Sequence, residues 1–449
     1  MPWMKRLITV FYSLLFIFVP LVWLSNTSEL FEFNKLILTY ILTTLIVGTW
    51  AIRCILEKKF IFKRTLLDWP ILIFLITQSL SLLFSIDPHV SWFGYYSRWN
   101  GGLLSLFSYS LLYWAFVSNM DSKSALRAVG CALWAAAVVA IYGSLEHFGF
   151  SLSCLLTTGS FNVSCWVQDV QTRVFATLGQ PNWLAAYLVA LIFIPLASKR
   201  LVLKGVSLLL FIALLFTKSR SGLLAFAISS LVFWAISLGK LEIRSIRNFV
   251  VLNSSFLILT LLVPNPIRDL IIKQKSSGLP AEASAKAGPA LEVGGTESGI
   301  IRRIVWSGAI KIWQANPKNF LIGTGPETFA QAYYQYRPLE HNQTSEWELL
   351  YNKAHNEFLN YLATTGILGL LSYLVLLFFM VRQMLNTRYL ILNTALLAGW
   401  VSISVTNFWG FSVVIMQLLL FLLPATAIVI EDGEQSPERS RRAKSNHDK

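Results

Sequence analysis

Six basic side chains stand beside long apolar segments, where an anionic substrate would meet a membrane surface. They are Arg98, Arg173, Lys218, Arg220, Arg302 and Arg303. Arginine offers a planar fork of N–H donors that matches phosphate oxygens, so several such residues on one face favour phosphate or pyrophosphate binding. The alternative for each residue alone is that its side chain extends towards lipid headgroups. Lys218 and Arg220 share the short turn TKSRSG (217–222), which makes this turn the strongest anion-binding candidate.

His355 is the residue best suited to move a proton. It lies in the segment AHNEF (354–358), where a polar loop meets a long apolar segment. Imidazole accepts a proton near neutral pH, so His355 is the candidate general base. The alternative is a histidine that only hydrogen-bonds at a helix start, and His341 is a competing candidate base.

The chain lacks the motifs of several other chemistries. It has no H-E-x-x-H or paired C-x-x-C zinc pattern, no D-x-D pair, no P-loop and no G-x-S-x-G elbow. Glu346 and Glu348 have the right chemistry for a cation, but we expect them to be solvated. We therefore expect no metal and no cofactor.

The composition predicts that a membrane holds these residues in place. Of 449 residues, 55% are hydrophobic and 13% are charged, although the net charge is +14. Soluble proteins carry roughly 25% charged residues. A nucleic-acid-binding protein would need dense basic patches on a soluble fold, so we exclude that class. We expect an all-α polytopic membrane protein.

Twelve stretches are long and apolar enough to span a bilayer, which takes about 20 residues. They are 7–24, 36–52, 67–86, 101–118, 128–147, 174–198, 201–217, 221–239, 248–264, 356–381, 389–406 and 410–430. The short loops rich in Lys and Arg alternate with poorer ones, which predicts that both termini are cytoplasmic. The predicted organisation is nine spans in 1–264, a large extracytoplasmic loop at 265–354, three spans in 355–430 and a basic cytoplasmic tail at 431–449.

Two outer segments are long. The first, about 148–176, contains Cys154 and Cys165, which form either a disulfide on the oxidising side of the membrane or two free thiols. The second holds a Gly-, Ala- and Ser-rich stretch at 276–299, which predicts a flexible insert. From Ile300 onward, apolar residues recur at helical spacing with basic residues between them. This pattern indicates an amphipathic helix, either on the membrane surface or packed on the loop's own core.

The arrangement of short motifs resembles the O-antigen ligase and O-antigen polymerase superfamily of bacterial membrane glycosyltransferases. The motifs are SIDP (85–88) with RWNGG (98–102), GQPNWLA (179–185), TKSRSG (217–222), RIVW (303–306) with NP (316–317) and GTG (323–325), and HNEFL (355–359) with TGILG (365–369). The likeness covers roughly residues 80–430. Their order and their spacing around one long outer loop are more specific than any single motif.

The resemblance implies a metal-independent transferase with a GT-C-like architecture. It would lie in a bacterial cytoplasmic (inner) membrane, with its active site facing outward. The donor would be a glycan on undecaprenyl pyrophosphate, and the acceptor would be a glycolipid or a protein. We expect membrane lipids as further partners, and we expect no nucleic acid. By analogy, Arg220 and Arg303 hold the pyrophosphate and His355 activates the acceptor hydroxyl. Arg302 adjoins Arg303, which we prefer because Trp306 follows it three positions on.

The wider set of predicted substrate-binding residues comes from the same motifs and basic positions. It comprises Arg98, Arg173, Asn182, Lys218, Arg302, Trp306 and Asn356. Three alternatives to a ligase or protein O-oligosaccharyltransferase stay open: a polymerase of lipid-linked repeats, a transporter of an anion or lipid-linked sugar, and a scaffold that binds phosphate-rich lipid. The span interiors carry few ionisable residues, which disfavours the transporter.

Overall fold

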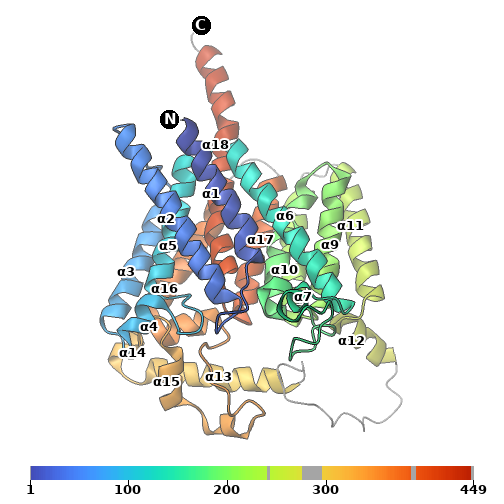
Figure 1. Ribbon diagram of the computed structural model, residues 1–449. Helices are drawn as coiled ribbons and strands as arrows, with labels where there is room; N and C mark the ends of the chain where they lie inside the picture. Colours follow the sequence, from blue (N-terminus) through green and yellow to red (C-terminus); the bar gives the residue numbers. More distant parts are fainter. Residues whose placement is uncertain (1, 240–242, 276–295, 386–390, 446–449) are drawn as a thin grey trace.

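The polypeptide folds into helices joined by turns. The computed structural model describes residues 2–239, 243–275, 296–385 and 391–445, and within these ranges there is no strand. Figure 1 shows long helices packed side by side, with shorter helices lying across one end. We call that end, which carries the described residues 263–275 and 296–356, the loop side. The opposite end, where α1 begins and α18 ends, is the termini side.

Twelve apolar helices form the bundle. By length and composition, seven helices among the described residues can cross a membrane: α1 (Pro2–Leu21), α2 (Glu32–Leu56), α6 (Ser122–His147), α10 (Arg220–Leu238), α16 (Glu357–Leu385), α17 (Ile391–Phe408) and the apolar part of α18 (Val414–Ser445). Five shorter apolar helices accompany them: α3 (Asp68–Leu83), α5 (Leu103–Asn119), α8 (Pro181–Ile192), α9 (Leu201–Phe216) and α11 (Ile243–Leu262). Each predicted span has its helix, and the predicted all-α polytopic fold is confirmed.

The prediction for the sixth span begins too early. Residues 174–198 are uniformly apolar, but Ala176–Leu178 forms only a 3-10 turn and Gly179 takes a left-handed conformation at φ 81°. Pro181 then occupies the first turn of α8, where its missing N–H costs nothing. This break sets residues 179–182 at the loop-side end of α8 instead of inside a span.

Short helices cover the loop side. They are α4 (Pro88–Phe93), α7 (Leu152–Thr158), α12 (Pro266–Lys275), α13 (Thr296–Gln314), α14 (Pro317–Ile322) and α15 (Phe329–Tyr336). Figure 1 shows α13 lying across the ends of the long helices. Most of the predicted insert 276–299 is outside the described residues, but its last four positions belong to α13. The side chains of the predicted basic tail from residue 434 onward are also outside them.

The loop side has a hydrophobic core of its own. Ile301 and Val305 of α13 pack with Phe329 and Tyr333 of α15, and this cluster is separate from the core of the bundle. Helix α13 therefore packs on the loop's own core, which was one of the two predicted arrangements.

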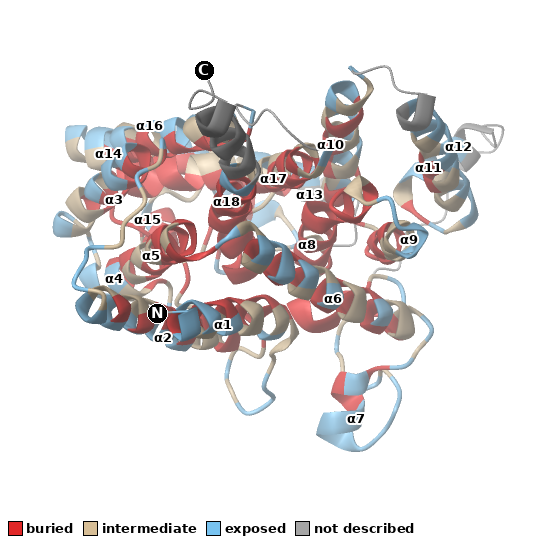
Figure 2. Ribbon diagram, turned by 90° about the horizontal axis from the view of Figure 1, so that it is seen from above, coloured by how far each residue is buried: buried red, intermediate tan, exposed pale blue. Residues whose placement is uncertain are grey.

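Small residues bring the helices near the loop-side end close together. A Cβ atom on Gly222 of α10 would lie 2.6 Å from the Cβ of Ala185 in α8, and one on Gly399 of α17 would lie 2.0 Å from the carbonyl oxygen of Ala190. Such close backbone approach is typical of membrane helix contacts. It packs α8 against both α10 and α17, which also pack directly against each other, in the centre of the bundle shown end-on in Figure 2.

Candidate active site

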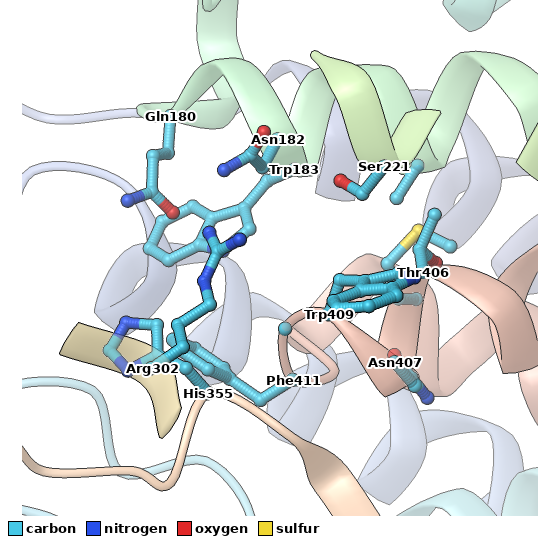
Figure 3. A pocket seen from close by; sticks show the side chains of 13 residues that line it. Gln180, Asn182, Trp183, Ser221, Arg302, His355, Thr406, Asn407, Trp409 and Phe411 are labelled. Carbon is cyan, nitrogen blue, oxygen red and sulfur yellow. The ribbon is translucent and has the colours of Figure 1, made fainter. Parts of the chain in front are cut away.

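A pocket opens where several helices meet at the loop side (Figure 3). Its lining comes from five parts of the chain: Gln180, Asn182, Trp183 and Ala186 near the start of α8; Ser221 of α10; Arg302 of α13; His355 before α16; and Thr406, Asn407, Trp409, Gly410, Phe411 and Met416 around the turn between α17 and α18. The pocket thus combines residues that are more than 230 positions apart in the sequence.

Helix N-termini surround this pocket. Helices α8, α10 and α18 each contribute a residue of their first turn, and α16 begins two positions after His355. The first N–H groups of a helix have no partner within it, and the helix dipole makes this end positive. Several N-termini around one pocket therefore favour an anion, as at many phosphate sites.

Hydrogen bonds lock the α8 and α10 side of the pocket. The Ser219 hydroxyl donates to Asn182 Oδ1 at 2.7 Å and accepts from the Gly222 N–H at 3.2 Å. Ser219 therefore caps α10 and also orients Asn182, which lines the pocket. The predicted substrate-binding residue Asn182 is thus held in a defined position.

The two neighbouring arginines of α13 point to different surroundings. Arg302 lines the pocket, and Figure 3 shows its side chain among the lining residues. Arg303 is exposed, with its Nε directed at the Gly299 carbonyl oxygen 3.5 Å away. The structure therefore places Arg302, and not the preferred Arg303, in the lining of the pocket. Trp306 stacks behind the pocket against Trp409, with ring centroids 5.9 Å apart.

His355 occupies a backbone conformation that few side chains adopt. Its φ is 52°, in the left-handed region. Its ring meets Phe411 edge-on at 5.4 Å between centroids and Tyr351 at 5.2 Å. The next residue, Asn356, is buried and accepts a hydrogen bond from the Leu359 N–H at 3.0 Å, so it caps α16 and does not line the pocket. His355 is therefore presented to the pocket from a tight, capped turn.

A buried ion pair supports this turn and was missed from the sequence. Lys353 and Glu327 bond to each other with side chains only 7% and 5% exposed. The Lys353 ammonium also lies 5.6 Å from the centre of the Phe411 ring, and the Arg98 guanidinium lies 5.1 Å from the same ring and 4.8 Å from that of Trp183. Arg98 thus sits behind two pocket-lining aromatic rings. Cation–π contacts of this kind stabilise ring positions by about 0.5–2 kcal/mol.

Removing one partner of this ion pair should destabilise the loop side strongly. We expect Lys353→Met to cost about 3–5 kcal/mol, because it leaves the Glu327 carboxylate buried without its counter-ion. The double variant Lys353→Met, Glu327→Met should recover most of that loss, since it removes both charges. Thermal unfolding in detergent measures the difference. Equal destabilisation by the single and double variants would contradict this account.

The remaining basic candidates lie beside the pocket and do not line it. Arg220 is the first residue of α10 and is exposed, whereas its neighbour Ser221 lines the pocket. Arg173 donates from Nε to the Thr217 carbonyl oxygen at 3.3 Å. Lys218 adopts φ 49° in the same turn. These three residues form a basic rim next to the pocket.

His341 is buried in the loop-side core and is absent from the pocket lining. Its Nδ1 and the Tyr333 hydroxyl are hydrogen-bonded at 2.6 Å. Burial, together with the positive charge of Arg337, lowers the pKa of His341 to about 4. The neutral, buried ring of His341 contributes to the packing of the loop-side core. His341 therefore does not compete with His355 for the pocket.

The lowered pKa of His341 predicts how the loop-side core responds to acid. Between pH 6.5 and pH 4, His341 takes up a proton in the unfolded chain but not in the folded loop-side core. The free energy of unfolding therefore falls as pH falls through this window and levels off below it. Hydrogen exchange of residues 329–354, corrected for intrinsic rates, measures this loss. His341→Gln removes the titrating group and should flatten this part of the profile. An unchanged profile would assign the acid sensitivity to other groups.

The cysteines predicted as a possible pair form a disulfide. Cys154 and Cys165 have Cα atoms 5.4 Å apart and close the loop that contains α7. This loop leads through Phe175 and Gly179 into the pocket wall at Gln180.

Sequence reasoning missed the turn between α17 and α18. Thr406, Asn407, Trp409 and Phe411 line the pocket, but none of them was among the site residues predicted from the sequence. The available signal was the cluster of aromatic and amide side chains in a turn between two apolar segments.

Part of the chain matches a known family. Residues 205–374 match the family model described as O-antigen ligase. The match contains Arg220, Arg302 and His355 but ends before the α17–α18 turn and begins after the start of α8. No curated protein matches the chain.

Proposed function

We propose that the chain belongs to the O-antigen ligase superfamily, whose family model matches residues 205–374, and that it transfers a glycan from undecaprenyl pyrophosphate to an acceptor hydroxyl. A membrane glycosyltransferase-like function follows from the family and the apolar helices. The donor, the acceptor, the outward-facing site in a bacterial inner membrane and the metal-independent mechanism are our proposal.

One observation carries the proposal: Arg302, His355 and several helix N-termini share a pocket at the end of the membrane bundle. The pyrophosphate would lie between Arg302 and the first turns of α8 and α10, where Asn182 and Ser221 offer polar contacts. Arginine and helix N-termini together provide positive potential without a metal ion.

The chemistry requires a proton acceptor and a stabilised leaving group. The acceptor oxygen bonds to the anomeric carbon as the bond from that carbon to the pyrophosphate oxygen breaks. His355 takes the hydroxyl proton, and the undecaprenyl pyrophosphate leaves with the bonding electron pair. Arg302 and the helix ends stabilise the negative charge that grows on it. Arg220, Lys218 and Arg173 on the rim would attract the donor before it binds.

The position of the pocket suits a lipid-linked donor. Because the pocket lies at the ends of apolar helices, a prenyl chain can stay in lipid while the pyrophosphate reaches Arg302. The distribution of Lys and Arg supports cytoplasmic termini, so the pocket would face outward.

The test is transfer by purified protein from a defined undecaprenyl-pyrophosphate glycan, with a lipid A core, an acceptor protein and a second donor molecule supplied in parallel. Single-step transfer to one of the first two acceptors supports a ligase or protein transferase. Products that grow in steps with the second donor molecule alone would identify a polymerase. Absence of transfer to all three acceptors, with donor binding intact, would reject the proposed reaction.

A further inference from the structure

The lipid-facing stripe of α6 continues beyond the end of that helix. Trp134, Ile141 and Phe148 recur at seven-residue intervals, which places them on one helix face, and they are 57%, 50% and 65% exposed. Exposed large apolar side chains on a membrane-spanning helix face lipid. Phe148 already lies past the last residue of α6, so the same surface runs into the disulfide-closed loop.

That loop carries no charge over 21 residues. Residues 148–168, FGFSLSCLLTTGSFNVSCWVQ, contain no Lys, Arg, Asp, Glu or His. The loop nevertheless exposes a set of large apolar side chains: Phe150, Leu152, Leu155, Leu156, Phe161 and Val167. Leu156 is 76% exposed and Val167 is 99% exposed. A patch of this kind in water is unfavourable and marks a contact surface.

Hydrogen bonds and ring contacts hold one side of the loop against the bundle. Its apolar side chains are therefore exposed on the other side. Tyr142 of α6 accepts a hydrogen bond from the Ser153 N–H at 3.0 Å and bonds to the Ser151 hydroxyl at 3.1 Å. Trp166 packs on Phe175 with ring centroids 5.1 Å apart. Together with the Cys154–Cys165 disulfide, these contacts present the apolar side chains away from the bundle.

The place of the loop in the fold identifies what covers it. Figure 1 shows α7 at the level of the loop-side ends of α6, α9 and α10. Figure 2 shows that α7 projects sideways from the bundle beside α6 and away from the other helices. At this depth and on this side, the neighbouring medium is the boundary between lipid headgroups and acyl chains, where aromatic and apolar side chains are favoured.

We propose that residues 148–168 form a disulfide-closed element that inserts into the lipid leaflet on the loop side, with Phe148, Leu156 and Val167 in contact with lipid. The inference does not depend on the reaction proposed above. Residues 169–179 connect this loop to Gln180 in the pocket wall.

The test compares two leucines with matched exposure. A small fluorescent amino acid is placed at Leu156 or at Leu339, which is 81% exposed on the loop side. The full-length protein is then reconstituted into vesicles with nitroxide-labelled lipids. We expect several-fold stronger quenching at position 156, greatest with the label near the headgroup. The same residue at position 167 gives a second, independent reading.

Reduction of the disulfide should weaken quenching at position 156, because the free loop no longer holds its apolar face towards lipid. Equal quenching at positions 156 and 339 would overturn the proposal and leave the loop in solvent. A photocrosslinker at position 156 that joins two copies of the protein in place of lipid would overturn it as well, by assigning the patch to a protein interface.

Discussion

Arg302→Ala should reduce kcat/KM for glycan transfer by about 10²–10³, the cost of removing one preorganised donor to a developing negative charge. Arg303→Ala should change it by less than about threefold, as exposed substitutions usually do. The two residues are neighbours on α13 with the same charge and helix propensity, so Arg303→Ala controls for both. Arg302 lines the pocket and Arg303 is exposed.

Arg302→Lys sharpens this comparison. Lysine keeps the positive charge but lacks the planar guanidinium group. If Arg302 binds pyrophosphate through bidentate hydrogen bonds, we therefore expect partial activity in this variant. Binding of undecaprenyl pyrophosphate, measured directly, should weaken in the order wild type, Arg302→Lys, Arg302→Ala. If Arg303→Ala impaired transfer as much as Arg302→Ala, the pocket would not be where the pyrophosphate binds.

Helix phase explains why the two neighbouring arginines of α13 have different surroundings. Residues on an α-helix advance by about 100° each. Ile301, Val305, Ala309 and Ile312 are the buried residues of α13, and on this spacing Arg303 falls on the opposite side of the helix while Arg302 falls on its flank. The preference for Arg303 rested on Trp306 three positions further on, a spacing that does not show which side of the helix faces the pocket.

The bundle itself was predictable because a lipid environment imposes a simple rule. Every span needs an apolar run and internally bonded backbone, so each of the twelve segments appears as a helix. The site follows no local rule. Phe411 and Trp183 meet Arg98 from three distant parts of the chain, and the Lys353–Glu327 pair joins two loop positions 26 residues apart. Such contacts depend on tertiary packing, which periodicity and motifs do not encode.

His355→Asn should lower kcat for transfer by about 10²–10⁴, the usual contribution of a positioned general base. Asparagine is a better replacement than alanine, because position 355 has φ 52° and asparagine adopts the left-handed region more readily. The variant therefore removes the proton acceptor with little added backbone strain. Donor binding should stay within about threefold of wild type, since the pyrophosphate contacts arise from Arg302 and the helix ends.

The control is His89→Ala, which removes another loop-side histidine whose exposed ring contacts that of Phe93 at a tilt, with 5.0 Å between centroids. It should leave transfer unchanged. Added imidazole should restore part of the activity of the His355→Asn variant, because a free base can occupy the space left by the ring, and it should not help Arg302→Ala. Near-normal kcat in His355→Asn would assign His355 to the turn before α16 instead of to proton transfer. Loss of donor binding in that variant would make it a positioning residue for the donor.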